Sequence, residues 1–349
     1  MKPKTSKNRE KNDYNYLKQT DGLLLLDKAC GFSLVRHIGR GTFGAVFEVQ
    51  DSTGHHLSIK KVLQDPRFKN RELEICQKLD HPNILPLLHY FFTKEGIRPE
   101  IYLHLVTPLF PMDLSMYLKL IGPPSNYILK AFAFQLFCAV SYVHSINVCH
   151  RDLKPKNVLV DPGSGLLQVC DFGSAKSLVP NEPSVSYIAT RNYRAPELLY
   201  GSTSYGTSID VWAAACIIAE LIIGKRALFL GENNDGMIQS VAQIIGSPKP
   251  EDIKAMKGNK PYTGPYIPPV KLSVVLDNYN DDQMVDLLSR LFVYSPLKRM
   301  TAYECTLHPC FDCVKRGEVI LHNGKRFFPP ADTKTNFGRI KTLASTCYI

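Results

Sequence analysis

A glycine-rich segment and a lysine on the next strand-like run are the first residues that could do chemistry. Gly39, Gly41 and Gly44 lie between runs rich in β-branched and aromatic residues, which favour strands. Such glycines let backbone N–H groups approach phosphates, because no Cβ stands in the way. Lys60 would supply a cation for those phosphates, and Glu72 is its expected partner, because a carboxylate on an inward apolar helix stripe needs a cation. These residues predict a phosphate site, although a plain glycine-containing hairpin is the alternative for the glycine motif alone.

Further along the chain, three more motifs contain acidic and amide side chains. His150-Arg151-Asp152-Leu153-Lys154-Pro155-Lys156-Asn157 precedes Asp171-Phe172-Gly173, and Ala195-Pro196-Glu197 follows. With the glycine segment and Lys60 they stand in the order of the protein-kinase signature. The chain therefore resembles a eukaryotic protein kinase from about Phe32 to Phe311, which implies transfer of the ATP γ-phosphate to protein.

The resemblance assigns a role to each catalytic residue. Asp152 would orient the attacking hydroxyl and accept its proton, and Lys154 would stabilise charge on the transferred group. Asn157 and Asp171 would hold Mg²⁺, while Lys60, aligned by Glu72, would hold the nucleotide phosphates. The expected catalytic set is Asp152, Lys154, Asn157, Asp171, Lys60 and Glu72.

The resemblance also implies where ATP binds. Val46 and Leu159 would sandwich the adenine, with Thr107 at the back, and main-chain groups of Pro108 and Phe110 would bind its edge. Ser58 stands where kinases usually have alanine, which adds a hydroxyl near the base. The expected ATP set is Ile38, Gly39, Gly41, Gly44, Val46, Lys60, Pro108, Phe110 and Leu159.

Other segments narrow the resemblance to one family. Lys154, together with Thr190 ahead of Ala-Pro-Glu, resembles serine/threonine kinases rather than tyrosine kinases. Residues 60–65, 67–73, 171–176 and 185–188 are similar, almost residue for residue, to the glycogen synthase kinase 3 family. That family belongs to the group that also holds cyclin-dependent and MAP kinases.

A group of cations bears on the substrate. The arginine before a catalytic aspartate usually meets a phosphate on the kinase's own activation segment, but Val185 at the corresponding position cannot be phosphorylated. Arg71, Arg151 and Lys176 would then lack an anion, and the resemblance implies that a substrate phosphate four residues C-terminal to the target supplies it. Separate surface charges are the alternative for these cations. The rival functions are a proline-directed cyclin-dependent or MAP-type kinase without priming and a binding-only pseudokinase.

Two further residue sets are implied by the resemblance. Tyr187 is the expected regulatory phosphotyrosine, with Arg191 and Arg194 as phosphate partners, and an unmodified packed tyrosine is the alternative. Glu197 and Arg299 resemble the ion pair that ties the activation segment to the helical lobe.

The order of elements predicts an α+β, bilobal kinase fold. Strand-like runs at 32–38, 45–49, 56–62 and 101–106 precede helical stripes at 128–143 and 211–223. Asp65-Pro66 predicts the start of the single N-lobe helix. The expected divisions are a flexible basic tail (1–31), an antiparallel β N-lobe (32–106), a hinge (107–112), a mainly helical C-lobe (113–311) and a C-terminal tail (312–349).

Composition excludes several classes of protein. With 44% hydrophobic and 21% charged residues, the 349-residue chain is neither disordered nor collagen-like. A net charge of +10 suits an anionic partner such as a nucleotide or a phosphoprotein. Ten cysteines are too sparse for a disulfide scaffold. We expect a cytoplasmic protein, with a nuclear location also open, that acts on pre-phosphorylated protein substrates; scaffold proteins are open as partners, and neither nucleic acid nor a membrane is expected.

Overall fold

The computed structural model describes residues 31–40, 44–65, 67, 70–95, 100–179 and 182–330. Contacts between residues divide the chain into two compact units. Within the described part, unit 1 holds the residues up to Leu73 and Pro86–Leu109, and unit 2 holds Glu74–Leu85 and the residues from Phe110 onward. This division falls inside the expected hinge, whereas almost all of the expected N-terminal tail lies outside the described residues.

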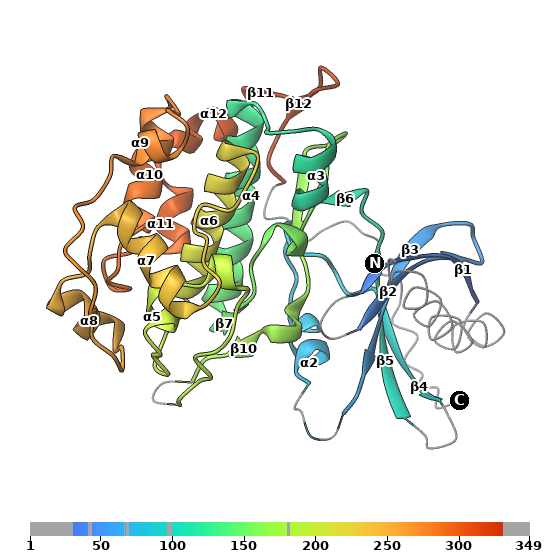
Figure 1. The fold of residues 1–349 in the computed structure, drawn as a ribbon. Helices are drawn as coiled ribbons and strands as arrows, with labels where there is room; N and C mark the ends of the chain where they lie inside the picture. Colours follow the sequence, from blue (N-terminus) through green and yellow to red (C-terminus); the bar gives the residue numbers. More distant parts are fainter. Residues whose placement is uncertain are drawn as a thin grey trace, which may run out of the picture. The chain divides into compact units, whose positions relative to one another are not determined.

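Unit 1 contains one antiparallel sheet (Figure 1). Its strand order is β1-β2-β3-β5-β4. Each run predicted as a strand lies within one of these strands, while β4 has no counterpart in the sequence prediction. The bounds are β1 Phe32–Arg40, β2 Ala45–Asp51, β3 His56–Leu63, β4 His89–Glu95 and β5 Glu100–Pro108.

The two faces of this sheet carry different sets of side chains, because successive side chains on a strand alternate between faces. Phe47, Val49, Ile59, Phe91 and Val106 pack together on one face as a buried core. The opposite face carries the residues expected around the nucleotide. The register pairs Val46 with Lys60 and Ser58 with Thr107, so these four residues share that face.

The helix that carries Glu72 is shorter than predicted. Helix α2 spans Glu72–Cys76, and the described residues from Asp65 to Arg71 are not helical. The prediction of a start at Asp65 is wrong: the Asp65 carboxylate accepts the N–H of Arg67 and pairs with that guanidinium at 2.6 Å, but the chain at Arg67 is a turn and the helix begins only at Glu72. Asn70 Oδ1 instead accepts the N–H of Glu72 at 2.9 Å, where the helix begins.

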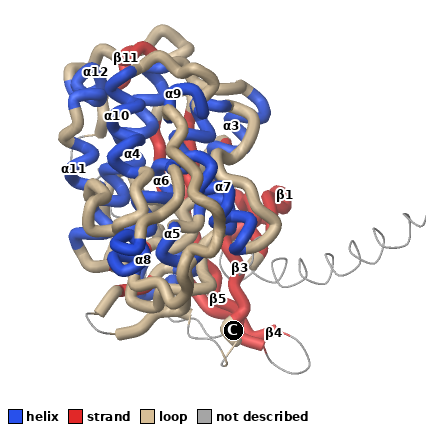
Figure 2. The backbone as a smooth tube through the Cα atoms, turned by 60° about the vertical axis from the view of Figure 1, so that its left-hand side comes forward, coloured by secondary structure: helices blue, strands red, loops and turns tan. Residues whose placement is uncertain are grey.

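Unit 2 is mainly helical (Figure 2). Its two longest helices, α4 and α6, pack against each other, and α6 is buried along nearly its whole length. Helix α6 ends at Gly224, whose φ of 75° is a left-handed value that favours glycine. The bounds are α3 Leu114–Leu120, α4 Asn126–Ser145, α5 Pro196–Leu199, α6 Ser208–Ile223, α7 Asn234–Ile245, α8 Pro250–Met256, α9 Leu272–Val275, α10 Asp282–Leu291, α11 Ala302–Thr306 and α12 Asp312–Lys315.

Short strand pairs position the loops of unit 2. Strands β6 (Met112–Asp113), β8 (Val158–Asp161) and β9 (Leu166–Val169) form one small sheet. Strands β7 (Val148–Cys149) and β10 (Lys176–Ser177) form another, so the segment before Asp152 lies beside the segment after Asp171.

The first part of the expected C-terminal tail is folded onto unit 2. Strands β11 (Val319–Ile320) and β12 (Arg326–Phe327) form a hairpin. Val314, Val319, Leu321 and Phe327 bury themselves against Ala131 of α4. The compact part of unit 2 therefore continues past residue 311, and residues 331–349 lie outside the described part.

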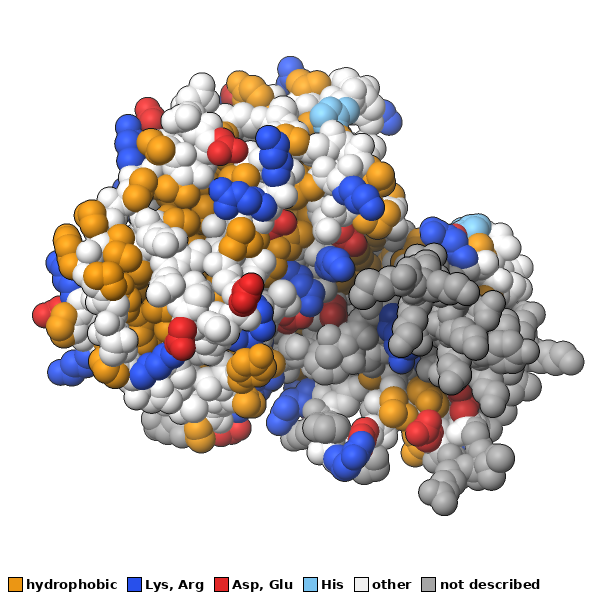
Figure 3. All heavy atoms as spheres, in the orientation of Figure 1, with side chains coloured by type: hydrophobic (Ala, Val, Ile, Leu, Met, Phe, Trp, Pro, Cys, Tyr) orange, Lys and Arg blue, Asp and Glu red, His pale blue; other side chains and the backbone are white. Residues whose placement is uncertain are grey.

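Two surface properties bear on the expected partners. Among the described helices, α4 alone is long and apolar enough to cross a membrane, but 67% of that window is buried inside the structure, as is usual for a core helix. Figure 3 shows basic side chains spread over unit 2 in that view, interleaved with hydrophobic and acidic ones.

Candidate active site

The expected catalytic base is held by two residues, Thr190 and Lys154. Asp152 Oδ1 accepts hydrogen bonds from the N–H and the hydroxyl of Thr190, at 2.9 and 2.7 Å. Its Oδ2 pairs with Lys154 Nζ at 2.6 Å, and Lys154 also donates to the Thr190 hydroxyl. The carboxylate is thus fixed in orientation, with a cation beside it. Thr190 marks the kinase class in the sequence, but the motif alone does not reveal its bond to Asp152.

Asn157 has the geometry of a metal ligand. Its Nδ2 donates to the main-chain oxygen of Asp152 at 2.8 Å, which turns Oδ1 away from that contact. Asn157 Oδ1 accepts no hydrogen bond from any described residue. An oxygen ligand of this kind suits Mg²⁺, which prefers oxygen ligands and usually keeps several waters.

Asp171 is held close to Asn157 by the main chain. The N–H of Cys170 donates to the Asn157 carbonyl at 3.0 Å. Asp171 has a φ of 63°, a left-handed value that is rare outside glycine and is found at functional sites. The structure therefore brings Asp152, Asn157 and Asp171 together within unit 2.

A buried aspartate that the sequence analysis missed holds the main chain of the loop that carries Asp152 and Asn157. Asp210, at the start of α6, accepts the N–H groups of His150 and Arg151 at 2.7 and 2.8 Å. Burial raises the pKa of Asp210, but its hydrogen bond and charge interaction with His144, with the other donors, outweigh burial and hold the pKa below its usual value. Asp210 is therefore an ionised anchor for the catalytic loop. The available signal was an acidic residue in an apolar run, the pattern that identified Glu72.

In unit 1, Lys60 and Glu72 form the expected ion pair. Lys60 Nζ lies 2.5 Å from Glu72 Oε1, and the side chains are 18% and 3% exposed. The carboxylate fixes the lysine at the sheet face that also carries Val46 and Ser58.

The glycine segment is only partly described, because Gly41 lies outside the described residues. Gly39 is on β1, and Gly44 directly precedes β2. A Cβ on Gly44 would collide with the main-chain oxygen of Lys61, so glycine is needed there for packing alone. The other ATP candidates in unit 1, Ile38 and Pro108, lie on β1 and at the end of β5, while Phe110 and Leu159 belong to unit 2.

Comparison with known proteins decides the family. A model of the protein kinase domain matches residues 32–311. The serine/threonine-protein kinase RIM11/MSD1 of Saccharomyces cerevisiae is 43% identical over 301 residues, covering 84% of this chain and 79% of the relative. Protein kinase gsk31 of Schizosaccharomyces pombe is 41% identical (87% and 81% covered), and glycogen synthase kinase 1 of Pyricularia oryzae is 40% identical (88% and 79%).

The chain belongs to the glycogen synthase kinase 3 family of protein kinases. It is an ATP-dependent serine/threonine kinase, and the predicted fold is confirmed, with an antiparallel sheet in the N-lobe and a helical C-lobe.

Two of the three expected priming cations lie close together in unit 2 of this kinase. Arg151 Nε donates to the carbonyl of Ser174, and Lys176 lies two residues further on. Lys176 is not without an anion, as the sequence analysis supposed, because its Nζ pairs with Glu182 at 2.8 Å. The third cation, Arg71, lies in unit 1, directly before Glu72.

The activation segment is connected to Arg151 through a tyrosine. Tyr205 accepts a hydrogen bond from Arg151 Nη1 at 3.3 Å and donates to the carbonyl of Val185 at 2.9 Å. The position where related kinases carry a phosphate is thus linked to the arginine that would meet it.

The surroundings of Tyr187 differ from the expectation in one respect. Tyr187 is 70% exposed, and the Arg194 guanidinium lies 4.6 Å from the centre of its ring. Arg194 is itself buried and donates to Ile188, Ala189 and Asn234, so its donors already hold the chain around Tyr187. Arg191, the other expected partner, is exposed.

The ion pair at the end of the activation segment is present. Arg299 Nη1 lies 2.8 Å from Glu197 Oε1, and the two side chains are 0% and 1% exposed. Arg299 also donates to the carbonyls of Ser208 and Val293. These bonds connect α5, the start of α6 and the segment before α11.

Proposed function

We propose that this kinase prefers protein substrates already phosphorylated four residues C-terminal to the target serine or threonine. The observation that carries the proposal is the link from Arg151 through Tyr205 to Val185, a residue that cannot be phosphorylated. Arg151 is 8% exposed within the protein, and a buried cation is stabilised by a nearby anion. A substrate phosphate would supply that anion to Arg151, Lys176 and Arg71.

Each catalytic residue has a proposed role in the transfer itself. Asp152, fixed by Thr190 and Lys154, orients the substrate hydroxyl and accepts its proton. Lys154 then faces the negative charge that develops on the transferred group. Lys60, aligned by Glu72, binds the phosphates of ATP.

Asn157 and Asp171 are the proposed ligands of Mg²⁺. Protein kinases use MgATP, and bound Mg²⁺ would neutralise charge on the phosphate oxygens. Asn157 contributes Oδ1, and the left-handed backbone at Asp171 sets the direction of its carboxylate. Val46 and Leu159 are the proposed contacts of the adenine, and the main chain of Pro108 and Phe110 its hydrogen-bonding partners.

The priming proposal is tested with two peptides that differ by one phosphate. The steady-state rates for a Ser-x-x-x-phosphoSer peptide and its unphosphorylated twin are compared in wild type, Arg71→Ala, Lys176→Ala and the control Lys325→Ala, whose side chain is exposed. Losing a hydrogen bond to a charged group costs about 1.5–3 kcal/mol, so each priming-site variant should lose about 10- to 100-fold in kcat/KM for the primed peptide alone. Equal rates for both peptides in wild type would refute priming and leave the kinase intact.

The rival functions give different results in the same assay. A proline-directed kinase would respond to proline after the target residue and not to the distant phosphate. A binding-only protein would turn over neither peptide, and its ATP hydrolysis would not change in Asp152→Asn. We also propose a cytoplasmic location for this kinase. Binding to scaffold proteins is a further proposal, which co-purification from cells would test.

A further inference from the structure

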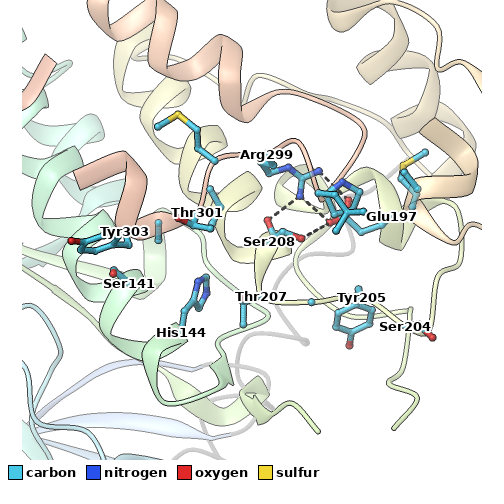
Figure 4. Close-up of a pocket in the computed structure, with 18 of the residues that line it drawn as sticks. Ser141, His144, Glu197, Ser204, Tyr205, Thr207, Ser208, Arg299, Thr301 and Tyr303 are labelled. Carbon is cyan, nitrogen blue, oxygen red and sulfur yellow. Dashed lines mark hydrogen bonds and ion pairs between the residues drawn. The ribbon is translucent and has the colours of Figure 1, made fainter. Parts of the chain in front are cut away.

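Unit 2 contains a groove away from the catalytic residues (Figure 4). It lies between the end of α4, the start of α6, the end of α8 and the segment that leads into α11. Ser141 and His144 come from α4, Thr207 from the start of α6, and Tyr303 from α11 (Figure 4). The volume is about 620 Å³, which is within the range of small-molecule sites.

The lining of this groove is mostly apolar and is partly exposed. Val211 and Met256 form buried walls, while Leu297 and Tyr303 are 89% and 62% exposed at its edge. Large apolar side chains around a concave surface are typical of binding sites, because a ligand removes them from water. The body of a ligand that fits here is therefore apolar.

The charge of the groove favours an anion. Glu197 is neutralised by Arg299, and His144 Nε2 lies 3.1 Å from Asp210 Oδ2. Lys257, also in the lining, forms no side-chain hydrogen bond or ion pair with any residue in the described part of the chain. One cation is thus left uncompensated at the edge of an apolar groove.

Hydrogen-bond donors accompany this cation. The hydroxyls of Ser141, Ser204 and Thr207 have no partner among the residues that the structure describes, and Thr207 does not cap α6. Arg299 is 4% exposed in the lining, and its Nε–H has no acceptor in the same part of the chain. The Arg299 Nε atom is itself buried, and the guanidinium lies over the Trp212 ring, so the donors that an anion in the groove can reach are the three hydroxyls.

The geometry points to a regulatory binding site for a small amphipathic anion: a carboxylate or sulfonate head near Lys257 and an apolar body between Leu297, Tyr303 and Val211. The lining contains no residue of the expected catalytic or ATP sets, but it includes Tyr205, which links Arg151 to Val185. The head group would be bound by Lys257 and the hydroxyls, and the body would cover the exposed apolar side chains.

Two contacts connect the groove to the catalytic residues. His144 lines the groove and bonds Asp210, which accepts the N–H groups of His150 and Arg151 directly before Asp152. Glu197 and Arg299 in the lining fix the end of the activation segment. An occupant that shifts His144 or this ion pair changes the position of the catalytic loop, so it should alter kcat more than the KM for ATP.

The test uses anilinonaphthalene sulfonate, a fluorescent aromatic anion, titrated into the full-length kinase with ADP at saturation to block the nucleotide site. Decanoate is the competitor, and decanol is its uncharged counterpart. The variants are Lys257→Gln and Lys257→Glu. Lys254→Gln is the matched control, because it removes the same charge three residues earlier, in the helix that ends just before Lys257, and Lys254 does not line the groove.

The proposal predicts saturable binding to wild type and displacement by decanoate but not by decanol. The Kd should rise about tenfold in Lys257→Gln and still further in Lys257→Glu, while Lys254→Gln changes it less than about twofold. Binding that ignores both Lys257 variants, or displacement by decanol as strong as by decanoate, would overturn the anion site.

Kinase activity tests the regulatory part. With ATP at saturation, decanoate should change kcat at least about twofold in wild type and leave Lys257→Glu unchanged. The basal kcat of Lys257→Glu should equal that of wild type, since Lys257 contacts no catalytic residue. Binding that depends on Lys257 but leaves kcat unchanged would overturn the regulatory role. If the groove binds an acidic peptide but neither anilinonaphthalene sulfonate nor decanoate, the proposed class of ligand is wrong.

Discussion

His104 should make unit 1 sensitive to acid. This imidazole is completely buried on β5, stacks on Phe91 with ring centres 4.6 Å apart, and bonds the Thr93 hydroxyl through Nε2 at 2.9 Å. Its Nδ1 has no partner among the described residues. Burial, followed by the charge of Lys61, lowers the pKa of His104 from 6.5 to about 3.

The size of the effect follows from linkage between protonation and folding. Because the folded-state pKa lies below the unfolded value, the unfolded chain binds a proton as the pH falls below 6.5 while the folded chain stays neutral. The contribution of His104 to stability is therefore complete above pH 6.5 and is lost as the pH falls toward 3. Between pH 7 and pH 5 the expected loss in the free energy of unfolding is about 2 kcal/mol.

Chemical denaturation at pH 7 and pH 5 measures this loss in wild type and in His104→Gln. The difference between the two pH values should be about 2 kcal/mol smaller in the variant, whatever its absolute stability. His55→Gln is the matched control, since the His55 side chain is 79% exposed in the folded chain. The reasoning is refuted if wild type and His104→Gln lose the same free energy between pH 7 and pH 5.

Three further variants probe unit 2. Glu182→Gln removes the anion that occupies Lys176, so the KM for a primed peptide should fall about three- to tenfold in steady-state kinetics, and an unchanged KM would argue against the pocket. Arg299→Ala strands the buried Glu197 carboxylate, and denaturation should show a loss of about 3–5 kcal/mol, partly recovered when Glu197→Gln is added; a loss below about 1 kcal/mol would contradict the assigned burial. Asp210→Asn weakens the bonds to His150 and Arg151, so kcat should drop at least about tenfold with the KM for ATP little changed, which a coupled kinase assay distinguishes from a binding defect.

The sequence predicted best where a single residue contradicted its surroundings. Glu72 on an apolar stripe required a cation, and the structure places Lys60 there. Strands β1, β2, β3 and β5 were predicted because their β-branched and aromatic residues are local signals of a strand. β4 was missed because its polar residues, such as Thr93 and Glu95, belong to a buried network that only the folded sheet creates.

Several contacts of single side chains were not predicted, whether the partner is distant or close in sequence. The apolar run around Asp210 indicates that its carboxylate needs a partner, but it does not indicate which one, because the bonded residues lie about sixty positions away. The start of α2 was misplaced because Asp65 and Asn70 both accept an N–H two residues on, and only the bond from Asn70 lies at the start of the helix. Glu182 was overlooked as the partner of Lys176, because nothing in the sequence distinguishes it from other acidic residues nearby.

The ion pair between Lys176 and Glu182 determines whether an acidic residue in a substrate can replace the priming phosphate. Under the proposed priming, an incoming group gains only the difference between its own attraction to Lys176 and that of Glu182, which is already 2.8 Å away. A substrate carboxylate carries the same single charge as Glu182 and exchanges like for like, whereas a phosphate carries nearly two charges and three acceptor oxygens. Glutamate or aspartate in place of the priming phosphate should therefore be a poor imitation, and the kinase would respond to the prior modification itself rather than to acidity near its target.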